Sequence, residues 1–81
     1  MNKETIETLD KILPVVERVH SEHHPELHKV AELYNELKKA PSRVIFDEMQ
    51  AVTGNYAVPD DACLTYAKTY NLLEALDREF A

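Results

Sequence analysis

The sequence predicts a single small all-α domain over residues 1–81, a bundle of about four helices of which two are long and two are short. Apolar residues recur at intervals of three and four along the chain, which is the helical period. No segment alternates apolar and polar residues as a strand does. A chain of 81 residues is long enough for one hydrophobic core and too short for two.

The first predicted helix begins near Ile6 and ends before a His-Pro pair. Its apolar residues fall on one stripe: Ile6, Leu9, Leu13 and Val16. The next position of that stripe is His20. Pro14 lies inside the segment, where it removes one backbone donor and is expected to kink the helix. His24-Pro25 marks a boundary, because the residue before a proline disfavours helical angles.

Pro25 and Glu26 suit the first turn of a second helix, where a missing donor costs nothing and a carboxylate faces the positive helix end. The apolar face of this helix comprises Leu27, Val30, Ala31, Leu33, Tyr34 and Leu37. Lys38 and Lys39 favour its C-terminus. The following break ends at Ser42, which is expected to cap the third helix.

The third predicted helix is short, and its apolar residues are Val44, Ile45, Phe46, Met49 and Val52. Gly54 is the only glycine and is expected to end this helix in the left-handed conformation. A loop follows over residues 55–59, after which Asp60 or Asp61 is expected to cap the fourth helix. The apolar face of that helix comprises Ala62, Cys63, Tyr66, Tyr70, Leu73, Leu76 and Phe80.

Net charge and cysteine content indicate which kinds of partner and which cellular location to expect. Fifteen acidic residues against nine basic ones give a net charge of −6, which argues against nucleic acid and against an anionic membrane surface. No apolar run approaches the roughly 20 residues that span a bilayer. A single cysteine excludes an internal disulfide and favours a cytoplasmic location. Eight acidic residues are expected on solvated helix faces: Glu7, Glu22, Glu32, Glu36, Asp47, Glu48, Glu74 and Asp77.

Histidines form the one concentrated chemical feature, at positions 20, 23, 24 and 28. Glu17 and His20 make a Glu-x-x-His pair, of which carboxylate-bridged di-iron bundles use two. Two hypotheses follow. In one, the cluster is a polar helix junction in which His20 hydrogen-bonds to the backbone at the edge of the core. In the other, Glu17, His20, His23 and His24 bind a metal ion, within one chain or between chains.

The remaining reactive side chains suggest no catalysis. Cys63 is expected to be a small buried apolar residue, with a redox-reactive thiol at a helix N-terminus as the alternative. The four tyrosines are expected to anchor a core or an interface. One glycine is too few for a phosphate-binding loop, and no Ser-His-Asp arrangement or structural zinc spacing is present. The chain is therefore not expected to be an enzyme.

Two stretches carry a family resemblance. Residues 16–27 read Val-Glu-Arg-Val-His-Ser-Glu-His-His-Pro-Glu-Leu and are followed by Leu-Tyr-Asn-Glu-Leu at 33–37. Residues 52–56 read Val-Thr-Gly-Asn-Tyr and precede Pro-Asp-Asp-Ala-Cys-Leu-Thr-Tyr at 59–66. Both stretches are similar, in the same order, to segments of the hemerythrin-like proteins that repair iron–sulfur clusters. Together they comprise 30 of the 81 residues of the chain.

The resemblance implies a fragment of a hemerythrin-like four-helix bundle, which in that family encloses a non-haem di-iron centre. His20 matches a family iron ligand. A His-x-x-x-Glu helix would be expected between the two stretches, where this chain has only residues 38–42, and Ala40 falls near another ligand position. The final His-x-x-x-Glu and an upstream histidine helix also have no counterpart. The resemblance therefore predicts a shortened form without a complete intramolecular di-iron site.

Two functions are consistent with these observations. The first is a small accessory protein similar to the cluster-repair di-iron proteins, which binds iron weakly or only as an oligomer. In such an oligomer, two or more copies would supply His20 and Glu17 with His23 or His24. The second is a metal-free helical module for protein–protein interaction, such as dimerisation. Both predict a homodimer or a protein partner, no nucleic acid and no membrane.

Overall fold

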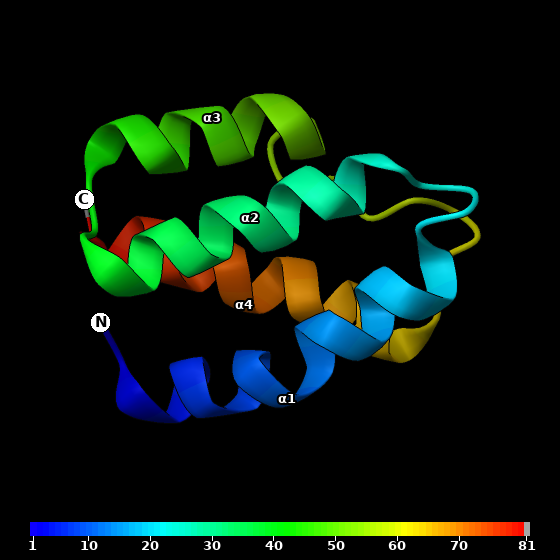
Figure 1. Ribbon diagram of the computed structural model, residues 1–81, viewed down its shortest axis with the longest axis horizontal. Helices are drawn as coiled ribbons and strands as arrows, with labels where there is room; N and C mark the ends of the chain where they lie inside the picture. The colour runs from blue at the N-terminus through cyan, green and yellow to red at the C-terminus, as the bar shows by residue number, and fades with distance from the viewer. Residues whose placement is uncertain (81) are drawn as a thin grey trace.

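The computed structural model describes residues 1–80 and confirms the predicted all-α bundle. Four helices follow one another along the chain: α1 (Lys3–His20), α2 (Glu26–Lys39), α3 (Arg43–Thr53) and α4 (Leu64–Phe80). The described residues contain no strand. In Figure 1, α2 and α4 lie between α3 and α1, and both chain ends lie at the end of the bundle opposite the α1–α2 junction. Ala81 lies outside the described residues.

Helix α1 is continuous through its proline. The side chain of Asn2 caps its start by accepting hydrogen bonds from the backbone N–H groups of Glu4 and Thr5. Pro14 lies inside this helix, and Figure 1 shows α1 bending between its two halves, as a proline predicts. The helix ends at His20, four residues before the His-Pro pair, so His24 lies in the turn that follows.

One hydrophobic core joins the four helices. Helix α1 packs against α4 and α2, and α2 packs against α3. The apolar stripes predicted for α1 and α2 face this core, and all four tyrosines are buried in it. The buried apolar side chains are Leu9, Leu13, Val16, Leu27, Val30, Leu33, Tyr34, Leu37, Phe46, Met49, Tyr56, Tyr66, Tyr70, Leu73 and Leu76.

Helix α3 begins and ends as predicted. Ser42 caps its start by accepting a hydrogen bond from the backbone N–H of Ile45. Gly54 follows its last residue with φ +63°, in the left-handed region that favours glycine. The left-handed backbone continues through Asn55 and Tyr56, at φ 62° and 63°, which the sequence pattern did not predict. The backbone N–H of Tyr56 donates to the Thr53 side chain, which stabilises this turn.

Four predictions about individual residues were wrong. Neither Asp60 nor Asp61 caps α4, because the helix starts at Leu64 and Cys63 occupies the position before it. Cys63 is exposed rather than buried, since it precedes the helix instead of lying on its apolar face. Val44 points away from the core and is 65% exposed. Asp77 is buried rather than solvated, because α3 and the turn after it cover that face of α4.

Candidate functional site

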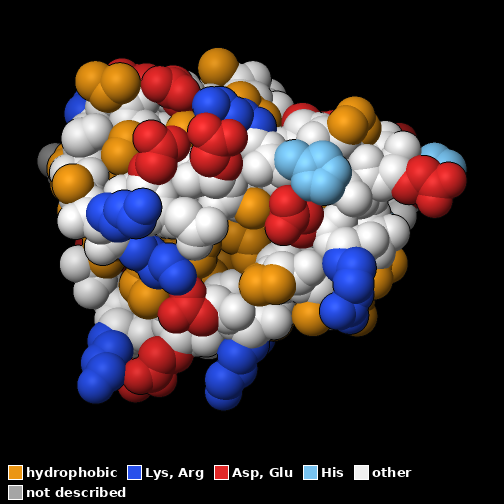
Figure 2. Space-filling model, in the orientation of Figure 1, with side chains coloured by type: hydrophobic (Ala, Val, Ile, Leu, Met, Phe, Trp, Pro, Cys, Tyr) orange, Lys and Arg blue, Asp and Glu red, His pale blue; other side chains and the backbone are white. Residues whose placement is uncertain are grey.

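Three segments bring reactive side chains together at one end of the bundle. These are the end of α1, the turn into α2 with the first turn of α2, and the loop before α4. In Figure 1 the turn after α1 and the loop before α4 run side by side at the end of the molecule away from both termini. Figure 2 shows histidine and acidic side chains next to one another on this end. We call this region the junction cluster, and its residues are Glu17, His20, His24, Glu26, His28, Asp61 and Cys63.

His20 contacts the cysteine of the distant loop. Its Nε2 lies 3.3 Å from Cys63 Sγ, although 43 residues separate the two along the chain. The backbone N–H of Tyr66 also donates to Cys63 Sγ, at 3.4 Å, so the thiol takes the place of a cap at the start of α4. The His20 imidazole meets the buried ring of Tyr66 edge-on, with 5.1 Å between ring centroids. These contacts fix both the ring and the thiol.

His24 lies between two carboxylates. Its Nε2 is 2.9 Å from Asp61 Oδ1, and its Nδ1 is 3.3 Å from Glu26 Oε2. The hydrogen bond with Asp61 is the main cause of a raised pKa for His24, and Glu26 raises it further. The same hydrogen bond lowers the pKa of Asp61 below its usual value. His24 therefore attaches the loop before α4 to the start of α2 most strongly when its imidazole is protonated.

Glu17 and His28 form a third pair across the α1–α2 junction. Glu17 Oε2 lies 2.9 Å from His28 Nδ1. His28 is exposed, so solvent screens this pair, and its contribution to stability is small. Glu17 therefore approaches a histidine of the next helix rather than the histidine three residues along its own helix.

The predicted metal ligands do not converge within one chain. The side chains of Glu17, His20, His23 and His24 make no hydrogen bond or ion pair with one another in the part of the chain that the structure describes. His23 is exposed, and the other three have the partners given above. Among residues 1–80, no group of three or more His, Cys, Asp and Glu side chains is arranged to hold a metal ion. The hydrogen bond predicted from His20 to the backbone is replaced by its contact with a thiol.

Sequence reasoning missed the partners contributed by the loop before α4. Asp61 and Cys63 are 37 and 43 residues from the histidines that they contact, so local spacing carries no signal of the contacts. The one sequence feature that pointed to these residues was the family resemblance, because Asp61 and Cys63 both belong to its Pro-Asp-Asp-Ala-Cys stretch at 59–63. His28, the last of the four clustered histidines, also belongs to the junction cluster through its contact with Glu17.

A second polar cluster lies near the other end of the bundle and is structural. The Asp77 carboxylate is buried and accepts hydrogen bonds from Arg43, from Gln50 at 2.7 Å and from the Tyr56 hydroxyl at 2.7 Å. Burial alone would raise the pKa of Asp77, but these three donors outweigh it and hold the pKa below its usual value. The carboxylate thereby joins α4 to α3 and to the turn that follows α3.

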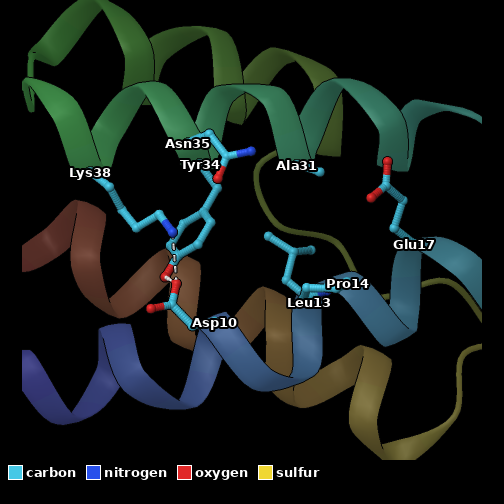
Figure 3. Close-up of a pocket in the computed structure, with 8 residues that line it drawn as sticks. All are labelled: Asp10, Leu13, Pro14, Glu17, Ala31, Tyr34, Asn35 and Lys38. Atoms are coloured by element: carbon cyan, nitrogen blue, oxygen red, sulfur yellow. Dashed lines mark hydrogen bonds and ion pairs between the residues drawn. The ribbon is translucent and has the colours of Figure 1, made fainter.

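A small hollow opens between α1 and α2 beside Pro14, with a volume of about 170 Å³ (Figure 3). At one end of it the Tyr34 hydroxyl donates to the Asp10 carboxylate at 2.8 Å, and Lys38 reaches the same oxygen at 2.9 Å. The hydrogen bond from Lys38 is the main cause of a lowered pKa for Asp10. The charges of Asp10 and Lys38 are therefore already paired, and Glu17, which also lines the hollow, contacts His28.

Comparison of the chain with protein-family models, curated proteins and solved structures finds no match. None of the helices over residues 1–80 combines the length and the apolar character that crossing a membrane requires. The junction cluster is therefore interpreted from its own geometry.

Proposed function

We propose that the protein is a small non-enzymatic accessory protein, similar to the di-iron proteins that repair iron–sulfur clusters, and that it binds iron weakly or only between copies. The observation that carries the proposal is the gathering of three histidines, three carboxylates and the only cysteine at one end of the bundle. Imidazole, carboxylate and thiolate are all ligands of iron. We place this activity in the cytoplasm, where a single unpaired cysteine remains reduced.

The pairing inside the junction cluster supports binding between copies rather than within one. His24 and His28 already contact carboxylates of their own chain, so a single copy offers few groups without partners. A symmetric dimer doubles every ligand that faces the partner. In this proposal His20 is the principal iron ligand, and Glu17 with the exposed His23 or with His24 completes the site across the interface. Glu17 then exchanges His28 for the metal, and His24, where it is used, exchanges Asp61.

The test is the iron content of protein produced in iron-rich medium and purified without oxygen. The expected result is substoichiometric to stoichiometric iron in the wild type and its loss in His20→Ala. Cluster repair is tested separately, by adding the iron-loaded protein to an iron–sulfur dehydratase that peroxide has inactivated. Faster recovery of the dehydratase supports the repair role. Recovery at the rate obtained with free iron alone contradicts it.

A second candidate function is a metal-free helical interaction module, and a specific observation favours it. Three apolar side chains are largely exposed: Val19 at 60%, Val44 at 65% and Leu64 at 90%. Covering them against a partner would stabilise a small domain whose own core is limited. This function predicts a dimer or complex whose stability is unchanged by a chelator. Dissociation on chelation would favour the iron-binding function instead.

A further inference from the structure

We infer that His20 and Cys63 form half of a metal site, and that a second copy of this chain completes it as a tetrahedral site of two cysteines and two histidines for a divalent cation of the Zn²⁺ class. The inference shares with the proposed function His20 and the placement of a metal between copies. Its other ligand differs, because it uses the Cys63 thiol and does not use Glu17, His23 or His24. Variants of Cys63 therefore separate the two proposals, whereas variants of His20 affect both.

The distance between the two ligand atoms fits one edge of such a site. Zinc binds imidazole nitrogen at about 2.1 Å and thiolate sulfur at about 2.3 Å, so the two atoms of a tetrahedral site lie about 3.6 Å apart. His20 Nε2 and Cys63 Sγ are 3.3 Å apart without a metal. A movement of a few tenths of an ångström in two side chains opens this pair to the tetrahedral distance. Soft thiolate together with imidazole selects zinc-like cations over magnesium or calcium.

The fold holds this pair in place before any metal arrives. Cys63 precedes α4 directly, and its sulfur accepts the backbone N–H of Tyr66. The Tyr66 ring is completely buried and meets the His20 imidazole edge-on. Its hydroxyl donates in turn to the Tyr70 hydroxyl at 3.4 Å. Because both ligands are already ordered by a rigid part of the core, little side-chain entropy is lost when they bind a metal.

In this inference a second copy provides the other two ligands, because no third His, Cys, Asp or Glu side chain of residues 1–80 joins the pair in a metal-binding arrangement. Asp61 and Glu17 have histidine partners of their own, His24 and His28. Cys63 is exposed and can reach across an interface. A two-fold axis beside the pair places the same imidazole and the same thiol on the opposite side of the metal.

The surface beside the pair suits a contact between two identical chains. Val19 precedes His20 in the sequence and is 60% exposed, and Leu64 follows Cys63 and is 90% exposed. Each of these exposed side chains therefore belongs to the sequence neighbour of one member of the touching pair. A second copy that brings its own pair to the metal would cover them and bury apolar area around the site.

The charges in the proposed step balance. Each Cys63 thiol transfers its proton to solvent as the sulfur–metal bond forms, and each His20 binds as a neutral imidazole. Two thiolates then neutralise the two positive charges of the cation. The metal keeps its oxidation state, so no oxidant or reductant is required. Two protons are released for each metal ion bound, which makes binding stronger as pH rises.

The experiment is a titration of the full-length, reduced, metal-free protein with Co²⁺ under nitrogen, followed by Zn²⁺. The expected result is saturation at one cobalt per two chains, with the visible bands of tetrahedral cobalt and sulfur-to-cobalt charge-transfer absorption. Zinc should displace the cobalt and abolish both. Sedimentation of the same samples should show the mass doubling only when metal is present.

Two variants and a control keep the result interpretable. Cys63→Ser retains an oxygen that can accept the N–H of Tyr66, so the start of α4 is preserved while the soft ligand is lost. Both Cys63→Ser and His20→Gln should lose the cobalt absorption and the metal-dependent dimer. Glu22→Ala removes an exposed carboxylate of the same turn and should titrate as the wild type. Far-ultraviolet circular dichroism verifies that each variant folds.

Several results would overturn the inference. These are the absence of cobalt binding, one cobalt bound per monomer, charge-transfer absorption that survives Cys63→Ser, or a dimer that ignores metal. Iron binding and cluster repair that persist in Cys63→Ser, together with no thiolate-dependent cobalt binding in the wild type, would remove the half-site while leaving the proposed function intact. A thiolate-dependent cobalt dimer without any repair activity would support the half-site and contradict the repair role.

Discussion

Replacing Asp77 with alanine should remove a large part of the stability of the fold. Asp77 is 5% exposed, and its carboxylate accepts from three side chains, of which Gln50 and Tyr56 approach to 2.7 Å. Removing one partner of a buried charged network costs about 3–5 kcal/mol, because the remaining polar groups lose their partner without regaining water. Arg43 is 40% exposed and can rehydrate, which places the expected loss toward about 3 kcal/mol. The total free energy of unfolding of a domain of this size is about 4–12 kcal/mol, at roughly 0.05–0.15 kcal/mol per residue, so this loss is a large part of it.

Urea unfolding followed by far-ultraviolet circular dichroism measures this loss. The matched control is Glu79→Ala, which removes an exposed carboxylate two residues further along α4 and should change stability by less than about 0.5 kcal/mol. Tyr56→Phe removes one of the donors and should show coupling with Asp77→Ala in a double-mutant cycle. A loss below about 1 kcal/mol in Asp77→Ala, or additive effects of the two variants, would refute the reasoning.

Four further predictions follow from the same structure. The pKa of Asp77 is lowered in the fold, so the contribution of its carboxylate to the free energy of unfolding is present above the unfolded-state pKa of 3.8 and is lost as pH falls through the folded-state pKa. In Asp77→Asn the free energy of unfolding should therefore depend less on pH in this acid range than in the wild type, and an equal dependence would contradict this. The pKa of His24 is raised in the fold, so its contribution to stability is complete below pH 6.5 and is lost as pH rises through the folded-state pKa. An NMR titration of the His24 imidazole should give a pKa above 6.5 that falls in Asp61→Asn but not in Asp60→Asn. Gly54→Ala should lower the free energy of unfolding measured in urea by about 1 kcal/mol. An added Cβ would meet no atom within 4 Å, so the cost comes only from holding alanine in the left-handed backbone conformation. An unchanged stability would be inconsistent with φ +63°. Tyr34→Phe loses the hydrogen bonds from the Tyr34 hydroxyl to α1 and should lower the free energy of unfolding by about 1 kcal/mol. An unchanged urea midpoint would argue against these hydrogen bonds.

Much of the fold was predictable because its signals are local. Helical spacing predicted four helices, and the prolines, Ser42 and Gly54 predicted where several of them begin or end. The bend at Pro14 follows from one missing backbone donor. The errors share a physical cause, which is dependence on neighbours distant in sequence. The burial of Asp77 becomes favourable only when α3 brings Arg43 and Gln50 against α4.

The candidate site was predictable only in part, for the same reason. The histidine-rich stretch indicated which end of the helices carries reactive groups, but spacing along one helix could not indicate their partners. The chain leaves helical geometry after His20, so His24 turns toward Asp61 instead of continuing one helical face. Cys63 was expected in the core because it was assigned to the apolar face of the fourth helix. Its role as the residue before α4 depends on where that helix starts, which the two preceding aspartates obscured.

The most direct test of metal binding between copies is native mass spectrometry of tag-free protein purified without oxygen, because one spectrum gives both the assembly mass and its metal content. The account predicts a dimer that contains metal, and a metal-free monomer after chelation or in His20→Gln. A folded monomer without metal in the wild type would contradict it, as would a dimer that stays intact when the metal is removed.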